Sequence, residues 1–196
     1  MYILNIFITI HNTIHNTITM RNIDIPILSV GIITAAFLRA VMAPLPNIEP
    51  VLLFTIVAGF TFGPIYGFLF AFSTMIISDF LILLPGIWSL YTSFTYGLMG
   101  FMVGIAGICK REWKRSEITL LSIFMILMYD TITAFFWSLN FMIPLQTALI
   151  SQIPFTELHL VSCTLVFLFA PSLIRYVENI RSEYTTRHIR LSTDLS

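Results

Sequence analysis

Residues 51–84, VLLFTIVAGFTFGPIYGFLFAFSTMIISDFLILL, contain a single charged side chain, that of Asp79. A run of about 20 apolar residues crosses a bilayer as a helix, so this stretch is long enough for more than one crossing. Its Gly63-Pro64 dipeptide breaks a helix and turns the chain. We therefore divide the stretch into two apolar spans, at 50–63 and 64–84, and take it as the mark of an integral membrane protein.

The composition of the whole chain supports this class. Of the 196 residues, 57% are hydrophobic and only 10% are charged, whereas a soluble domain carries about 25% charged residues. Ten Lys and Arg balance ten Asp and Glu, so no basic surface indicates nucleic acid as a partner. Cys109 and Cys163 both lie in apolar segments, which favours buried packing over a disulfide or a metal site. The composition thus excludes an ordinary soluble enzyme.

Four further apolar spans lie outside the deciding stretch. They occupy residues 27–43, 88–109, 117–139 and 155–176. We predict an all-α membrane protein, a bundle of six transmembrane helices over residues 27–176, with membrane lipid around it. An N-terminal segment, 1–26, and a C-terminal tail, 177–196, flank the bundle.

The cations predict the orientation of this bundle. The loops near 44–50, 84–88 and 140–154 contain no Lys or Arg. With six spans, nine of the ten cations share the opposite side, which the positive-inside rule assigns to the cytoplasm. Both termini are then cytoplasmic, and the protein is a multi-pass protein of the plasma membrane. The nine cations are Arg21, Lys110, Arg111, Lys114, Arg115, Arg175, Arg181, Arg187 and Arg190.

The tenth cation, Arg39, lies inside the first span. A charge there costs on the order of 3 kcal/mol by insertion scales, so it normally faces the protein interior and has a partner. Counted from the cytoplasmic ends, Arg39, Asp79 and Asp130 lie roughly 18, 22 and 20 Å deep, in one layer of the outer half. These carboxylates are candidate partners, either as part of a ligand site or only as structural neutralisation.

The fifth span changes character along one helical face. The outer half of this face is polar and continues inward as the apolar Ile126 and Ile123. Its polar residues are Asp130, Thr133, Trp137 and Asn140. This pattern predicts a pocket that is open to the outside and sealed below.

The fourth span also changes character along its length. Its outer residues Trp88, Tyr91, Thr92 and Thr95 share a face and give way to Gly97, Gly100, Gly104 and Gly107. Such a glycine stripe suits close helix packing. Trp88, Tyr91 and Trp137 are pocket residues in this interpretation, and an interfacial aromatic belt is the alternative.

The first span carries two stripes of small residues. Arg39 assigns the stripe with Gly31 and Ala35 to the bundle interior. The other stripe lies about 110° around the helix by the advance of 100° per residue, and it is free to accept a helix of another protein. We predict partner docking at Ala36, Ala40 and Ala43, with intramolecular packing as the alternative.

Histidines offer weaker signals. His11 and His15 are four residues apart and would meet a metal on a helix, but an exposed polar segment explains them better, and we predict no metal site. His159 suits a pocket or a hydrogen-bonded interior equally well. Glu157, near the start of the last span, suits the helix N-terminus.

Several of these segments resemble a known family. They are PLPNIEP at 44–50, AGFTFGPIYGFLFAF at 58–72 and ISDFLILLPGIWSLYTSFTYGLMGFMVGIAG at 77–107. They are similar to the substrate-binding S components of energy-coupling factor (ECF) transporters. One departure is that a common form of the family motif has Gly where Leu83 or Leu84 stands here.

The resemblance implies a six-helix vitamin-binding subunit whose extracellular site is capped by the loop between its first two helices. It also implies a transmembrane coupling subunit, which meets the Ala36 stripe, and two cytoplasmic ATPases. We expect the substrate to bind at Arg39, Asn47, Glu49, Asp79, Trp88, Tyr91, Asp130 and Trp137.

The predicted function is therefore high-affinity substrate binding in an ECF-type importer of a vitamin or related micronutrient. No G-x-x-x-x-G-K-[ST] motif occurs, so we expect no cofactor in this chain and ATP hydrolysis by the partner subunits. Arg39 suggests an anionic or carbonyl-rich group and the aromatic residues a flat ring, as in a vitamin or modified nucleobase. The alternatives are a scaffold of the same fold without transport and a membrane enzyme that uses Asp79 and Asp130.

Overall fold

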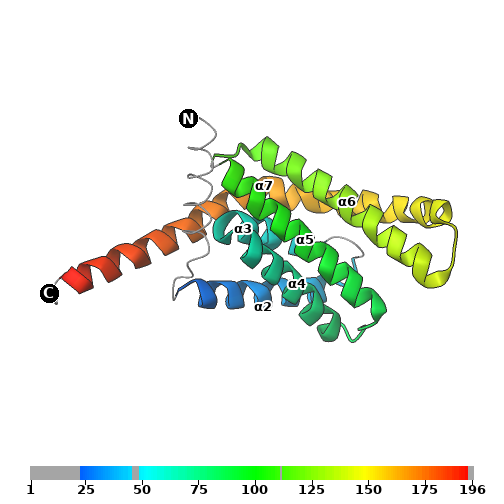
Figure 1. Cartoon of the computed structure of the whole chain (residues 1–196), viewed down its shortest axis with the longest axis horizontal. Coiled ribbons are helices and arrows are strands. Elements are labelled where there is room, and N and C mark those ends of the chain that lie inside the picture. The colour runs from blue at the N-terminus through cyan, green and yellow to red at the C-terminus, as the bar shows by residue number, and fades with distance from the viewer. Residues whose placement is uncertain (1–22, 46–48, 111, 194–196) are drawn as a thin grey trace, which may run out of the picture.

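The computed structural model describes residues 23–45, 49–110 and 112–193, which form six helices and no strand (Figure 1). The prediction of an all-α protein is confirmed. Asn47, His11 and His15 lie outside the described residues. The helices are α2 (Asp24–Met42), α3 (Val51–Phe62), α4 (Pro64–Leu81), α5 (Ile87–Cys109), α6 (Arg115–Phe141) and α7 (Leu145–Thr193).

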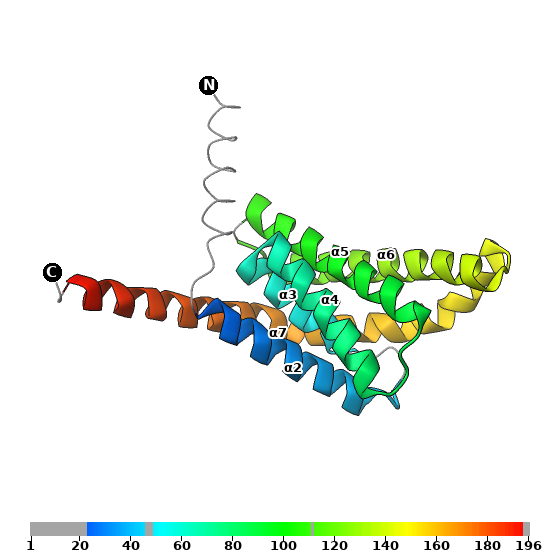
Figure 2. The same cartoon turned by 60° about the horizontal axis from the view of Figure 1, so that its bottom comes forward.

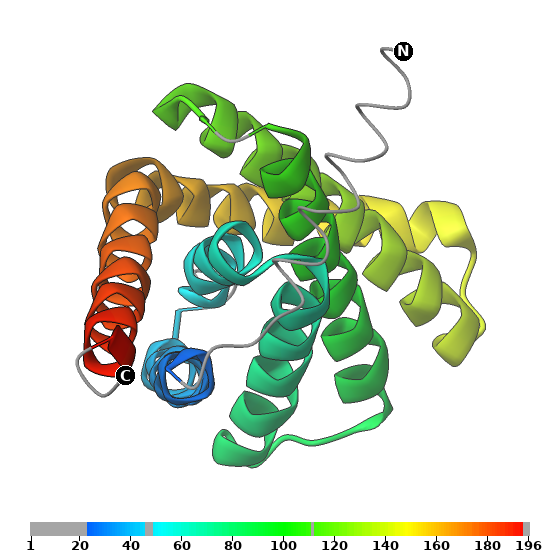
Figure 3. The same ribbon diagram turned by 60° about the vertical axis from the view of Figure 1, so that its left-hand side comes forward.

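The second predicted span is shorter than a membrane crossing. Five helices are long and apolar enough to span a bilayer. The 12 residues of α3 rise only about 18 Å, against a hydrocarbon core of about 30 Å. Ten of these residues are buried, as expected for a helix that is apolar on all sides. Figure 3 shows α3 inside the bundle, between α7 and the pair α4 and α5.

The predicted turn at Gly63-Pro64 is confirmed. Gly63 is the only residue between α3 and α4, and its φ of 87° lies in the left-handed region that glycine adopts without strain. Pro64 is the first residue of α4, where its missing N–H is not needed and its fixed φ suits the helix. This single residue lets α4 fold back along α3.

Three glycines bring α3, α4 and α5 into close contact. A Cβ on Gly100 would overlap the backbone of Gly67, and a Cβ on Gly67 would overlap the backbone of Gly100. A Cβ on Gly59 would lie 2.9 Å from the Gly100 carbonyl oxygen. Gly104 meets the backbone of Pro64 in the same way. The predicted packing role of the glycine stripe is confirmed, and its partner is the first half of α4.

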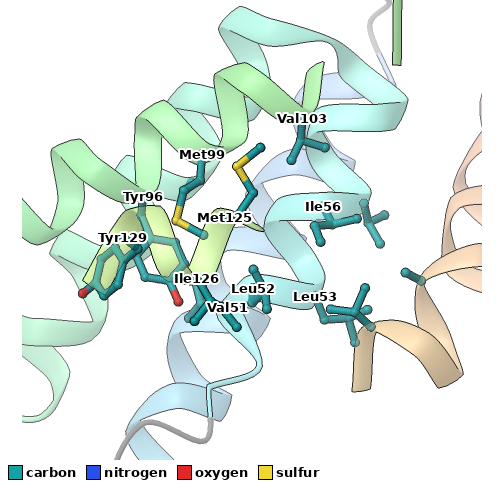
Figure 4. Packing of buried hydrophobic residues seen from close by; sticks show 14 of the residues in the cluster. Val51, Leu52, Leu53, Ile56, Tyr96, Met99, Val103, Met125, Ile126 and Tyr129 are labelled. Carbon is teal, nitrogen blue, oxygen red and sulfur yellow. The ribbon is translucent and has the colours of Figure 1, made fainter. Parts of the chain in front are cut away.

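Most buried apolar side chains form one cluster between α3, α4, α5, α6 and α7. Figure 4 shows Met99, Met125 and Ile126 packed together, with Tyr96 and Tyr129 side by side at one edge. Ile126 is buried in this cluster, as the sequence predicts for α6 below Asp130. The two tyrosines therefore mark where the apolar core ends and a polar layer begins.

Helix α7 is longer than predicted at both ends. It runs for 49 residues, so residues 145–154, predicted as loop, and residues 177–193, predicted as tail, are helical. Pro171 lies within α7 and cannot bond the Phe167 carbonyl four residues earlier. Arg115 of α6 donates to that carbonyl at 3.1 Å, which satisfies it in place of the missing N–H. Figure 2 shows the end of α7 projecting past the other helices.

An ion pair ties α7 to the start of α2. The guanidinium of Arg181 donates to both carboxylate oxygens of the buried Asp24, at 2.7 and 2.8 Å, and to the carbonyl of Thr61 near the end of α3. It also lies 4.7 Å from the ring centroid of Phe62. The start of α2, the end of α3 and the later part of α7 thus meet at one end of the bundle.

Candidate ligand-binding site

Arg39 is the centre of a polar cluster at the opposite end of α2. Its Nε donates to Oε1 of Glu49 at 3.2 Å. Its Nη1 donates to Oδ1 of Asp79 at 2.6 Å and to the hydroxyl of Ser78 at 2.7 Å. Asp79, proposed from its depth alone, is indeed a partner of Arg39. Glu49, which comes just before α3, is the second.

Glu49 extends the cluster to α5 and α7. The hydroxyl of Tyr96 donates to Oε2 of Glu49 at 2.9 Å, and the Glu49 backbone N–H donates to the hydroxyl of Ser162 at 2.8 Å. Burial raises the pKa of the Glu49 carboxyl, but the charge of Arg39, the nearby imidazole of His159 and the hydrogen bond from Tyr96 outweigh it and hold the pKa well below its usual range. Glu49 is therefore an ionised carboxylate inside the protein.

Among the described residues Asp130 pairs with side chains other than Arg39, so its prediction as a partner of Arg39 is wrong. Its Oδ1 accepts the side-chain amide of Gln152 at 3.0 Å and lies 3.1 Å from Nδ1 of His159. His159 is only 2% exposed, and its Nε2 lies 3.9 Å from Oε2 of Glu49. The imidazole thus stands between Glu49 and Asp130 and joins two groups into one polar network. We define the polar network as Arg39, Glu49, Ser78, Asp79, Tyr96, Asp130, Gln152, His159 and Ser162.

Several buried atoms of this network have no hydrogen-bond partner among the described residues. They are Oδ2 of Asp79, Oδ2 of Asp130 and Nε2 of His159. The hydroxyl of Ser93, three residues before Tyr96 on α5, is in the same state. A buried polar atom without a partner costs free energy of roughly 1–3 kcal/mol. These atoms are therefore the strongest sign that the network has hydrogen-bonding capacity for a ligand.

Aromatic rings lie directly beside the network. The rings of Tyr96 and Tyr129 meet edge to face with centroids 4.8 Å apart (Figure 4). The ring of Tyr129 lies 5.3 Å from that of His159. Because the apolar cluster continues behind both tyrosines, the polar network is closed toward the core. This arrangement agrees with the predicted change from polar to apolar along α6.

The structure does not join the three predicted aromatic residues to this network. Trp88 is 39% exposed and donates its indole N–H to the carbonyl of Leu84. Trp137 is 44% exposed and contacts Phe141. Tyr91 stacks on Phe136 and links α5 to α6. A role of these residues, and of Asn47, in binding stays a prediction.

The predicted docking stripe on α2 is not continuous on the surface. Ala36 is fully buried within the chain, so its placement on a partner-facing surface is wrong. Ala40 is half-buried and Ala43 is exposed. Ala36 is buried because the helices packed on α2 cover a wider part of its surface than the side that Arg39 marks. Docking at Ala40 and Ala43 stays a prediction.

Comparison with known proteins gives a family match. A family model described as "ECF-type riboflavin transporter, S component" matches residues 21–172, which include the whole polar network. No curated protein and no solved structure matches the chain. The chain therefore belongs to the family of ECF-type riboflavin transporter S components, the substrate-binding subunits of these transporters, and is a multi-pass protein of the plasma membrane.

Proposed function

We propose that this chain binds riboflavin, or a closely related vitamin, at the polar network and delivers it to an ECF-type importer. The observation that carries the proposal is the set of buried polar atoms without partners on Asp79, Asp130 and His159. They lie in a chain whose family is described by riboflavin transport. A structural ion-pair cluster alone would gain stability from satisfying these atoms within the chain.

The chemistry of riboflavin suits the network. Its flat ring system carries an N–H and carbonyl oxygens, and its side chain carries hydroxyl groups. The hydroxyl and N–H groups would donate to the open carboxylate oxygens of Asp79 and Asp130, since a carboxylate oxygen accepts hydrogen bonds. The rings of Tyr96 and Tyr129 would provide the apolar contact for a flat ring. The excess of lysine and arginine at the opposite end supports an extracellular site.

Transport needs further chains in this proposal. S components work with a coupling subunit and ATPases, and this sequence has no nucleotide-binding loop. ATP is then hydrolysed by the partner subunits, and the coupling subunit docks on α2 near Ala40 and Ala43. The chain itself binds its ligand and carries out no chemical reaction on it.

A membrane enzyme is disfavoured by the partners of the two aspartates. An acid–base pair of carboxylates needs both groups at one reacting atom. Here Asp79 is held by Arg39, whereas Asp130 is held by Gln152 and His159. The family, moreover, is a transporter component rather than an enzyme. A scaffold without transport needs no ligand, so a test of ligand binding distinguishes it from the proposed function.

We expect the purified chain in detergent to bind one riboflavin with a dissociation constant of about 1 µM or tighter, which corresponds to about −8 kcal/mol. Quenching of flavin fluorescence during titration measures this, because stacking on tyrosine quenches the flavin. Mass spectrometry of co-purifying small molecules provides an independent identification. A folded protein that binds no flavin and carries no other vitamin would favour the scaffold.

Ala40→Trp should abolish ATP-dependent uptake in vesicles that contain the full complex, since a large side chain holds a partner helix away from close backbone contact. Riboflavin affinity of the isolated chain should stay within a few-fold, because Ala40 is outside the polar network. Leu120→Trp, at an exposed position on α6, is the matched control and should retain uptake. Unimpaired uptake by the Ala40 variant would exclude this docking surface.

A further inference from the structure

The polar network contains more negative than positive charge. Glu49, Asp79 and Asp130 contribute three carboxylates, and Arg39 contributes one guanidinium. His159 adds at most one further positive charge, so the formal charge of the network is negative whether or not the imidazole is protonated. All five side chains are at most 17% exposed, and water therefore screens this excess poorly.

The charge of Arg39 is already neutralised within the chain. Three of its five N–H donors go to Glu49, Asp79 and Ser78. Two carboxylates in contact with one guanidinium leave no positive excess for a ligand. The sequence suggestion that Arg39 attracts an anionic group therefore does not fit the geometry.

The buried polar atoms without partners also disfavour an anionic ligand. Oδ2 of Asp79 and Oδ2 of Asp130 are buried without a partner, and a carboxylate oxygen accepts only from an O–H or N–H group. Nε2 of His159, on a different kind of side chain, is also buried and open, 3.9 Å from Glu49. A ligand that fills these positions has to supply donors to both aspartates.

We infer that this network selects an uncharged or cationic vitamin rich in O–H and N–H donors and rejects ligands that carry a carboxylate or phosphate. The inference rests on the proposed function, because it concerns the ligand of the same site. Its physical basis is that a further buried negative charge would lie among carboxylates without a compensating cation, which is strongly unfavourable.

The sharpest test compares riboflavin with riboflavin 5′-phosphate, which share ring and side chain and differ in the phosphate. Wild-type protein should bind the phosphate at least tenfold more weakly. Size contributes to that ratio, so Asp130→Asn serves to isolate charge, since the amide keeps the shape of the carboxylate. In this variant the dissociation constant of the phosphate divided by that of riboflavin should fall about tenfold. Glu157→Gln, an exposed acid on the same helix as His159, should leave the ratio unchanged.

A second measurement does not depend on any variant. Wild-type protein is incubated with an equimolar mixture of riboflavin, thiamine, biotin and pantothenate, and native mass spectrometry identifies what it retains. Only the uncharged or cationic members should be retained. If Asp130→Asn does not fold, Asp79→Asn takes its place. If neither variant folds, the proposal is decided by the ratio of the two flavin dissociation constants in the wild type and by the vitamins retained from this mixture.

The outcomes separate the two proposals. Equal binding of both flavins, an unchanged ratio in a folded Asp130→Asn protein, or retention of biotin or pantothenate overturns the charge selection and leaves the vitamin-binding function standing. Retention of no vitamin overturns the proposed function and the selection with it. A weaker phosphate complex, together with a ratio that narrows only in the network variant, supports both.

Discussion

Gly100→Leu should abolish the folded bundle. A side chain at this position would overlap the backbone of Gly67 on α4, and backbone cannot move aside as the end of a side chain can. Overpacking of a core typically costs 1–3 kcal/mol, and here α3, α4 and α5 all meet at the affected point. We expect little or no monodisperse protein in detergent, measured by size-exclusion chromatography of the membrane extract and by thermal unfolding of whatever is recovered.

Gly107→Ala is the matched control on the same face of α5. A Cβ there would lie 3.0 Å from a ring atom of Phe60 and at least 3.4 Å from other atoms. A small shift of that ring accommodates the methyl group, so this variant should purify like the wild type. A monodisperse Gly100→Leu protein with normal riboflavin affinity would refute the proposed close contact of the three helices.

Arg39→Ala should weaken riboflavin binding at least tenfold. The change leaves Glu49 and Asp79 without the cation that they share inside the protein, which disorders the positions proposed for the ligand. Loss of one partner of a buried charged hydrogen bond costs about 2–5 kcal/mol of binding. Calorimetric titration measures the affinity, and thermal unfolding of the same sample reports whether the chain is folded.

Two further variants separate binding from folding. Glu157→Ala removes an exposed acid from α7 and should leave affinity unchanged. Arg39→Gln combined with Asp79→Asn keeps the buried charge nearer to balance, so it should fold better than Arg39→Ala while still binding weakly. Normal affinity in a folded Arg39→Ala protein would remove Arg39 from the ligand site.

The pairing of Arg39 with Asp79 was predictable because both lie on helices, whose constant rise converts residue number into depth. Glu49 was predictable only as a site residue, through the family resemblance. It lies in the connection before α3, where residue number does not give position, so its pairing with Arg39 needed the structure. The long reach of α7 was missed because Pro154 and the polar residues near it resemble a loop, whereas membrane helices tolerate proline when neighbours satisfy the freed carbonyls.

The aromatic face and the glycine face of the fourth span point in different directions. The sequence interpretation chose Trp88 and Tyr91 because of their aromatic rings. At 100° per residue, Ser93 and Tyr96 lie on the same side as Gly100, roughly 110° from the Trp88 face. Since Gly100 packs against α4, the serine and tyrosine face the interior and Trp88 does not. The glycine stripe was the better guide to the buried side, and it would have identified Tyr96.

The ion pairs at the two ends of α2 have a mechanical consequence. At one end Asp24 is bound to Arg181 of α7. At the other end Arg39 is bound to Glu49, whose backbone N–H is bound to Ser162 of the same α7. Helix α7 is thus joined to both ends of α2, directly at Asp24 and through Glu49 at the other end. A shift of α7 relative to α2 by one helical turn, about 5.4 Å, would break the hydrogen bonds at both ends, whereas a common tilt of the two helices would break neither set.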